Sequence, residues 1–99
     1  MSKGGYVYIL CSKKNGVLYT GVTADLATRL EQHRSGQGSG FAGRYFVRHL
    51  VWYEWFDVIE DAIAREKQIK AGSRADKIAL IEGRNAEWRD LSEDEGFLQ

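Results

Sequence analysis

Five side chains that lie far apart along the chain have the types needed to cleave a phosphodiester bond. They are two tyrosines, an arginine, a histidine and a glutamate: Tyr8, Tyr19, Arg29, His33 and Glu66. Such cleavage needs a base to activate water, a cation to stabilise the phosphoryl oxygens and, in many enzymes, a metal ion to hold the leaving oxygen. No single one of these residues is a strong signal, so the hypothesis requires elements that bring all five into one cleft.

Four of the five residues also have an ordinary structural explanation. Tyr8 and Tyr19 can simply pack in the core. Arg29 and His33 are four positions apart on an expected helix, so their tips can converge, but such pairs usually form a solvated helix face.

Glu66 is the fifth residue, and it falls within an apolar helical stripe. A carboxylate there is costly unless it is paired or binds a cation. A salt bridge with an arginine is favoured by roughly two to one over a ligand for one divalent cation. The stripe consists of Ile59, Ala62, Ile63 and Ile69.

The residue pattern predicts an α+β fold, a small three-stranded antiparallel sheet flanked by helices in the order β-β-α-β-α-α. β-branched and aromatic runs predict strands at 6–11, 17–23 and 47–56. Caps predict three helices: from Thr23 or Asp25 to Gly36, from an Asp57–Glu60 capping box to about residue 71, and from Ser73–Asp76 to about 80–82, ended by Gly83. Asn85 is expected to cap a last turn that contains Trp88 and Leu91.

The turn sequence SKKNG joins the first two strands into a hairpin, but its register stays open. A Lys13–Lys14 turn places Tyr8 opposite Tyr19, whereas an Asn15–Gly16 turn places Tyr19 opposite Ser12. Both registers keep the two tyrosines on one face, and a shift by one residue would separate them.

The composition is that of an ordinary globular domain. The chain has 99 residues, of which 43% are hydrophobic and 28% charged. We expect one domain over 1–91, with a frayed acidic tail at 92–99. No apolar run approaches the ~20 residues that span a bilayer, and neither a signal peptide nor a membrane partner is expected. A single cysteine, Cys11, excludes an intramolecular disulfide and fits a small buried hydrophobe. These features suggest a cytoplasmic protein.

The net charge is zero, yet the charges are unevenly placed. Between Lys3 and Arg48 the only acids are Asp25 and Glu31. A polyanion would therefore approach the front half of the chain, although zero net charge argues against non-specific coating of nucleic acid. The end of the chain is acidic, with Glu87, Asp90, Glu93, Asp94 and Glu95.

Taken in order, these residues resemble the GIY-YIG nuclease superfamily. Tyr6-Val7-Tyr8 stands in the place of GIY, and Tyr19-Thr20-Gly21 in the place of YIG. Arg29, His33 and the Ala62–Glu66 motif follow at the expected spacings. The pattern over residues 6 to 91 is most similar to the small stand-alone bacterial proteins of the UPF0213, or YhbQ-like, group.

The resemblance implies metal-dependent endonuclease hydrolysis of DNA phosphodiester bonds, with Mg²⁺ or Mn²⁺ as cofactor. With no second domain expected to read sequence, we expect structure-selective or weakly selective cleavage, on DNA that is branched, damaged or single-stranded. It makes Tyr8 a base or water-orienting phenol that Tyr19 supports, although the two roles could be exchanged. A phenol with a reference pKa of ~10 is a poor base near pH 7, so its proton must pass to His33 or to hydroxide at the metal, or the phenol must act only by hydrogen bonding. Arg29 would clamp the phosphate, and Glu66 would hold the metal.

The chain also departs from the superfamily pattern. Tyr6 replaces the first glycine of GIY, and Val22 stands where many members carry a lysine. Asn85 is a possible counterpart of a late supporting asparagine, but a helix cap explains it better. The chain contains no proline, so the loop 36–43 would contact substrate differently.

Three functions compete at this stage. The first is the nuclease, and the second is a nucleic-acid-binding module with little or no hydrolysis, which zero net charge and Val22 favour. The third is a partner-binding role, with the aromatic run Trp52, Tyr53, Trp55 and Phe56 as the interface. Most of those aromatics are explained more simply as a core strand, so the nuclease is preferred.

Overall fold

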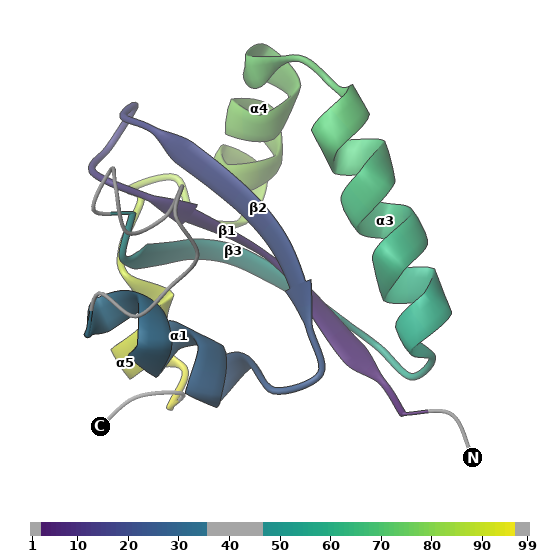
Figure 1. The fold of residues 1–99 in the computed structure, drawn as a ribbon. Helices are drawn as coiled ribbons and strands as arrows, with labels where there is room; N and C mark the ends of the chain where they lie inside the picture. The colour runs from purple at the N-terminus through teal and green to yellow at the C-terminus, as the bar shows by residue number, and fades with distance from the viewer. Residues whose placement is uncertain (1–2, 36–46, 97–99) are drawn as a thin grey trace.

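The computed structural model of this protein describes residues 3–35 and 47–96 (Figure 1). The expected loop after residue 36 lies outside the described residues. The α+β prediction is confirmed, because the three strands form one antiparallel sheet with helices on both sides. The elements are β1 (Gly5–Cys11), β2 (Leu18–Thr23), α1 (Leu26–Arg34), β3 (His49–Phe56), α3 (Ile59–Ala71), α4 (Arg74–Arg84) and α5 (Leu91–Asp94).

The sheet has the strand order β2-β1-β3, so β2 and β3 are its edges. Neither of the two named hairpin registers is correct. Tyr8 lies opposite Gly21, and Tyr19 lies opposite Leu10. A longer turn causes the difference: the chain reverses over residues 12–17, with Asn15 in the left-handed region at φ 59°. The two tyrosines nevertheless share one face, as both registers predicted.

Each face of the sheet carries its own core. α3 and α4 cover one face, and α1 and α5 cover the other (Figure 1). Because side chains alternate along a strand, β1 contributes to both cores. The first core contains Val7, Ile9, Cys11, Trp52, Ala62, Ile69, Ile81 and Trp88, and the second contains Tyr8, Leu10, Leu26, Leu30, Val47, Leu50 and Leu91. Cys11 is thus a buried hydrophobe, as predicted.

The helix ends agree with the sequence at some positions and differ at others. Asp25 caps α1, and Ser73 with Asp76 forms the predicted capping box of α4. The predicted Asp57–Glu60 box is wrong: Val58 is the N-cap of α3, and the Asp57 carboxylate accepts a hydrogen bond from the Trp55 indole at 2.9 Å.

Gly83 does not end α4, which continues to Arg84 and is closed by Asn85. The Asn85 side chain is buried, and it donates to the carbonyls of Val51 and Arg89 and accepts from the Arg89 amide. Asn85 therefore fixes the connection between α4 and α5.

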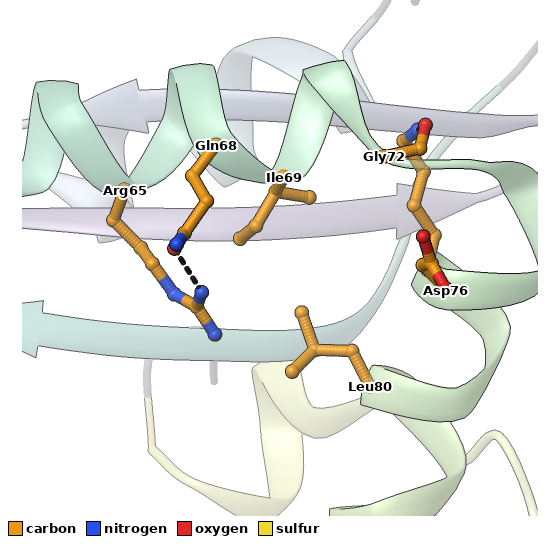
Figure 2. Close-up of a pocket in the computed structure, with 7 residues that line it drawn as sticks. Arg65, Gln68, Ile69, Gly72, Asp76 and Leu80 are labelled. Carbon is orange, nitrogen blue, oxygen red and sulfur yellow. Dashed lines mark hydrogen bonds between the residues drawn. The ribbon is translucent and has the colours of Figure 1, made fainter.

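A hollow of about 230 Å³ lies between α3 and α4 (Figure 2). Arg65 and Gln68 are hydrogen-bonded to each other at its wall. None of the five candidate site residues lines this hollow. Its lining consists of Arg65, Gln68, Ile69, Gly72, Asp76, Lys77 and Leu80.

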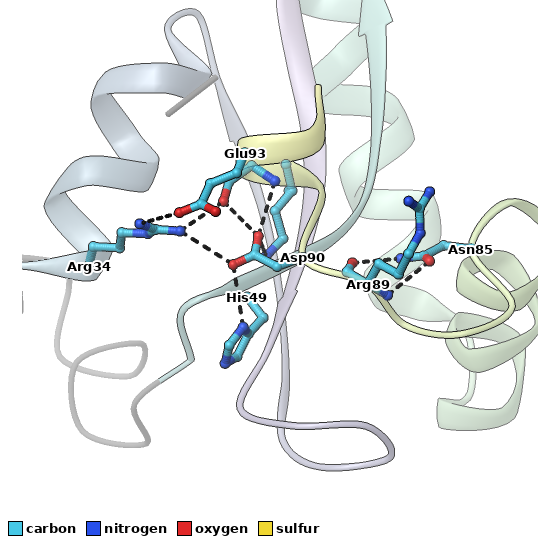
Figure 3. Close-up of polar contacts among 8 residues, drawn as sticks. Arg34, His49, Asn85, Arg89, Asp90 and Glu93 are labelled. Atoms are coloured by element: carbon cyan, nitrogen blue, oxygen red, sulfur yellow. Dashed lines mark hydrogen bonds and ion pairs between the residues drawn. The ribbon is translucent and has the colours of Figure 1, made fainter. Parts of the chain in front are cut away.

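The C-terminal segment is ordered further than the sequence predicted. The expected fraying is wrong for residues 92–94, because they belong to α5 and Ser92 is fully buried. Asp90 holds this segment in place (Figure 3). One carboxylate oxygen of Asp90 accepts from the Leu50 amide and from Ser92, and the other pairs with Arg34 and His49, each at 3.4 Å. Residues 97–99 lie outside the described residues.

None of the helices in the described part of the chain is long and apolar enough to cross a membrane.

Candidate active site

Tyr8 is positioned by the residue directly across the hairpin. Its side chain is 2% exposed and lies over Gly21. A Cβ atom on Gly21 would stand 2.5 Å from the Tyr8 hydroxyl and 2.6 Å from Cζ. Only glycine therefore leaves room for the phenol of Tyr8 to approach β2 this closely.

Tyr8, Tyr19 and His33 form a compact group of rings. The Tyr8 hydroxyl lies 3.5 Å from Nε2 of His33. The ring centroids are 6.3 Å apart for the two tyrosines, 6.2 Å for Tyr8 and His33, and 5.6 Å for Tyr19 and His33. His33 is buried, and its Nδ1 has no hydrogen-bond partner within residues 3–35 and 47–96.

Arg29 lies one turn before His33 on α1, and its side chain is exposed. Burial raises the pKa of Tyr8 and lowers that of His33, and the charge of Arg29 opposes the first shift and adds to the second. Arg29 therefore lies at the solvent side of the ring group, where a phosphate could reach it.

Glu66 comes from the other side of the sheet, on α3. Its side chain is 15% exposed, and its Oε2 lies 3.3 Å from Nζ of Lys70, one turn along the helix. The expected salt bridge is thus made to a lysine in place of an arginine. Burial is the main cause of the raised pKa of Tyr8, and the charge of the Glu66 carboxylate is a smaller one.

The predicted apolar stripe on α3 is wrong at one position. Ile63 is 38% exposed, whereas Ala62 and Ile69 are buried. The buried face of α3 is therefore narrower than the sequence suggested, and Glu66 lies at its border.

The two groups in the central contact have pKa values shifted in opposite directions. Burial is the main cause of the raised pKa of the Tyr8 phenol, and interaction with the neighbouring Tyr19 phenol adds to it. Burial, followed by the charge of Arg29, lowers the pKa of His33. Near pH 7 Tyr8 is a neutral donor and His33 a neutral acceptor.

A metal ion would find one suitable carboxylate here. Residues 3–35 and 47–96 contain no group of three His, Cys, Asp or Glu side chains arranged to hold a metal ion. Mg²⁺ commonly uses one or two carboxylates and completes its octahedron with water and substrate phosphate. Glu66 is a hard oxygen donor, and its charge acts on Tyr8, so the carboxylate fits a cation that binds together with substrate.

The fold thus groups Tyr8, Tyr19 and His33 by direct contact, and it places Arg29 and Glu66 close enough for their charges to act on Tyr8. Sequence reasoning overlooked Lys70, which engages Glu66. The available signal was the spacing of four residues on one predicted helix, which is typical of an ion pair.

Comparisons with known proteins show which families and structures this chain resembles. The family model of the GIY-YIG catalytic domain matches residues 4–79. A UPF0213 protein of Staphylococcus saprophyticus is 40% identical over 76 residues, which cover 77% of this chain and 92% of that protein. A UPF0213 protein of Staphylococcus aureus is 39% identical over 80 residues, which cover 80% of this chain and 95% of that protein.

A solved structure is similar as well. The solution NMR structure of the UPF0213 protein BH0048 from Bacillus halodurans superposes with a TM-score of 0.54 at 30% sequence identity. The match covers 91% of this chain and 95% of that one.

Proposed function

Since the chain belongs to the GIY-YIG catalytic-domain family and to its UPF0213 group, we propose that it is an endonuclease that hydrolyses DNA phosphodiester bonds with the help of one divalent cation, Mg²⁺ or Mn²⁺. The observation that carries the proposal is the contact between the Tyr8 hydroxyl and Nε2 of His33, whose pKa values are shifted in opposite directions.

The raised pKa of Tyr8 decides its role. A phenolate is not accessible near pH 7, so Tyr8 cannot act as the free base. With the ring hydrogen of His33 on Nδ1, Nε2 is the acceptor. The Tyr8 oxygen takes a proton from the attacking water while its own proton passes to His33, and the phenol is neutral before and after. The water oxygen then bonds to phosphorus, and the opposite phosphorus–oxygen bond breaks with its electron pair going to the leaving oxygen. Solvent protonates that oxygen, and His33 returns its extra proton to solvent.

The other three residues bind the phosphate, orient Tyr8 or hold the cation. Arg29 is exposed beside the rings and binds the phosphoryl oxygens as a planar fork. Tyr19 hydrogen-bonds Tyr8 and thereby orients the Tyr8 hydroxyl. Glu66 would hold the cation, which when bound neutralises charge on the phosphate and leaving oxygens.

We further propose that cleavage is structure-selective or only weakly sequence-selective. Sequence readout needs an element that enters a groove and contacts base edges. The helices of the described fold pack on the sheet, and the candidate site lies at the edge of that sheet.

A second candidate is a nucleic-acid-binding module with little hydrolysis. One contact favours it: the Lys70 ammonium lies 3.3 Å from Glu66 and offsets the charge that a cation would need. Val22, in place of a cationic residue after the YIG-like motif, points the same way.

Cleavage of labelled DNA separates these functions. Single-stranded, duplex and branched DNA are incubated with Mg²⁺ or Mn²⁺ and with the parent, Glu66→Ala, Arg29→Ala or Glu60→Ala. Glu60 is a matched control, because it is an exposed glutamate on the same helix. We expect the first two variants to lose about 10²-fold or more in rate and Glu60→Ala to keep it.

The other outcomes are equally informative. A parent protein that binds without cutting supports the binding module, and one that neither binds nor cuts at low salt contradicts both functions. A large drop in the melting temperature of Glu66→Ala would show that the pair with Lys70 is structural.

A further inference from the structure

We propose that the DNA strand leaving the ring group runs along β2, an edge strand of the described sheet, toward the hairpin turn, with its phosphates held by Lys70 and Lys77. This inference rests on the proposed function and adds the path of the substrate.

A groove of about 270 Å³ marks this path. It is lined by Leu18, Tyr19, Thr20, Lys70 and Lys77. Tyr19 belongs both to the groove and to the ring group, where its centroid lies 5.6 Å from that of His33. A strand whose phosphate is bound at Arg29 would therefore continue directly into the groove.

The two lysines can bind phosphate without giving up their present contacts. Lys70 uses its ammonium on Glu66 at 3.3 Å, and Lys77 donates to the Gly72 carbonyl at 2.9 Å. An ammonium has three donors, so each lysine keeps further donors for a phosphate oxygen. Lys77 is also the residue that the groove shares with the hollow between α3 and α4.

The direction of the proposed DNA strand follows from the position of the groove, which lies at the start of β2. Leu18 is the first residue of β2, directly after the turn. Arg74 donates to the Asn15 and Gly16 carbonyls, at 2.8 and 2.6 Å, and thereby ties the turn to the start of α4. The exposed Lys13 and Lys14 lie in this same turn and extend the cationic path.

The opposite end of the sheet is less suited to a phosphate chain. Trp55 is 48% exposed there, but its indole is bonded to the carboxylate of Asp57. Glu95 hydrogen-bonds Tyr53 and is a further cause of its raised pKa, after burial. Two carboxylates therefore border that aromatic surface, and they would repel phosphate.

The salt dependence of binding tests the path without any cleavage. A labelled single-stranded oligonucleotide is titrated in EDTA at several salt concentrations with the parent, Lys77→Ala, Lys77→Arg and Lys70→Ala. Lys3→Ala is the matched control, because Lys3 is an exposed lysine just before β1, at the end of the sheet away from the turn. Melting curves check that each variant folds.

Each lost phosphate contact reduces the slope of log K against log salt by about 0.7 for a single strand. We expect that loss in Lys77→Ala and Lys70→Ala, with weaker binding, and a parental slope in Lys77→Arg and Lys3→Ala. Lys77→Ala is decisive, because Lys70 also touches Glu66. An unchanged slope in Lys77→Ala, with a parent that binds and cuts DNA, overturns the path and leaves the nuclease intact. A parent that does not bind DNA refutes the nuclease and the path together.

Discussion

Gly21 and Tyr8 show how one backbone position controls a candidate catalytic group. The missing side chain of Gly21 is what allows the phenol of Tyr8 to lie against β2 with its hydroxyl 3.5 Å from His33. Glycine at this position of the YIG-like motif is thus a packing requirement of the tyrosine opposite.

We expect Gly21→Ala to displace the Tyr8 ring, because the new Cβ would stand 2.5 Å from its hydroxyl. Overpacking of this kind costs roughly 1–3 kcal/mol in the free energy of unfolding, and cleavage should fall sharply. Gly83→Ala is the matched control: among the described residues, apart from its chain neighbours and its own helix backbone, no atom lies within 4 Å of the added Cβ. This helical position should gain about 0.5–1 kcal/mol. Denaturant unfolding and the cleavage assay measure both, and full activity in Gly21→Ala would contradict the role of this glycine.

Burial is the main cause of the lowered pKa of His33, and the charge of Arg29 is the second. Replacing Arg29 measures this second cause. We expect Arg29→Gln to move the pKa of His33 upward, toward the ordinary value, in an NMR titration of the imidazole signals. The signals of His49, which lies with Asp90, should be unaffected. A His33 titration that is unchanged by the replacement would show that burial alone sets its pKa.

The sign of the pH dependence follows from the same shift. The folded pKa of His33 lies below the unfolded value, so the folded state binds its proton less readily. Its contribution to stability is complete above about pH 6.5 and is lost as the pH falls toward the folded pKa. Cleavage needs neutral His33, so the cleavage rate should also decline as the pH falls from about 6.5 toward the folded pKa of His33.

At the scale of elements, Asp90 joins three parts of the fold that are remote in sequence. Its hydrogen bonds reach the backbone of β3 and the start of α5, and its ion pair reaches Arg34 at the end of α1. Since α1 also carries Arg29 and His33, this network positions the helix that supplies two candidate site residues. Burial opposes ionisation of Asp90, but the bonds from Ser92 and Leu50 and the charge of His49 outweigh it and lower the pKa.

We expect Asp90→Ala to destabilise the protein by about 1–3 kcal/mol, because the Leu50 amide loses its side-chain acceptor. Glu93→Ala is the matched control. Glu93 also pairs with Arg34, but its side chain is 65% exposed, and such pairs contribute about 0–1 kcal/mol. Thermal unfolding of both variants near pH 7 compares them, and equal losses would contradict the role of Asp90.

Helix boundaries show where sequence patterns suffice and where they fail. The same Asp/Ser-x-x-acid pattern occurs before α3 and before α4, yet only Ser73 and Asp76 form the box. Before α3, the Asp57 carboxylate accepts a hydrogen bond from the Trp55 indole and does not cap the helix. Val58 is the N-cap instead. Competition from a neighbouring strand is a tertiary effect that a local pattern does not contain.

For the whole molecule, the sequence predicted the strands, the antiparallel sheet and the residue types of the candidate site. Helical spacing placed Glu66 near a buried face, but it could not tell that α3 packs on the sheet face opposite α1. The hairpin register was likewise open, because turn length decides it. The groove with Lys70 and Lys77 depends on how α3 and α4 pack beside β2, which no local pattern encodes.

The candidate site straddles the sheet edge, and this has a consequence for newly made protein. His33 is held by the packing of α1 on one side, and Glu66 by the packing of α3 on the other. Under the proposed function, a chain in which only one of these two helices has packed on the sheet lacks part of the candidate site and cannot cleave DNA. The protein would then cleave DNA only after both helices have packed against the sheet. Folding itself would therefore delay the appearance of nuclease activity in newly made protein.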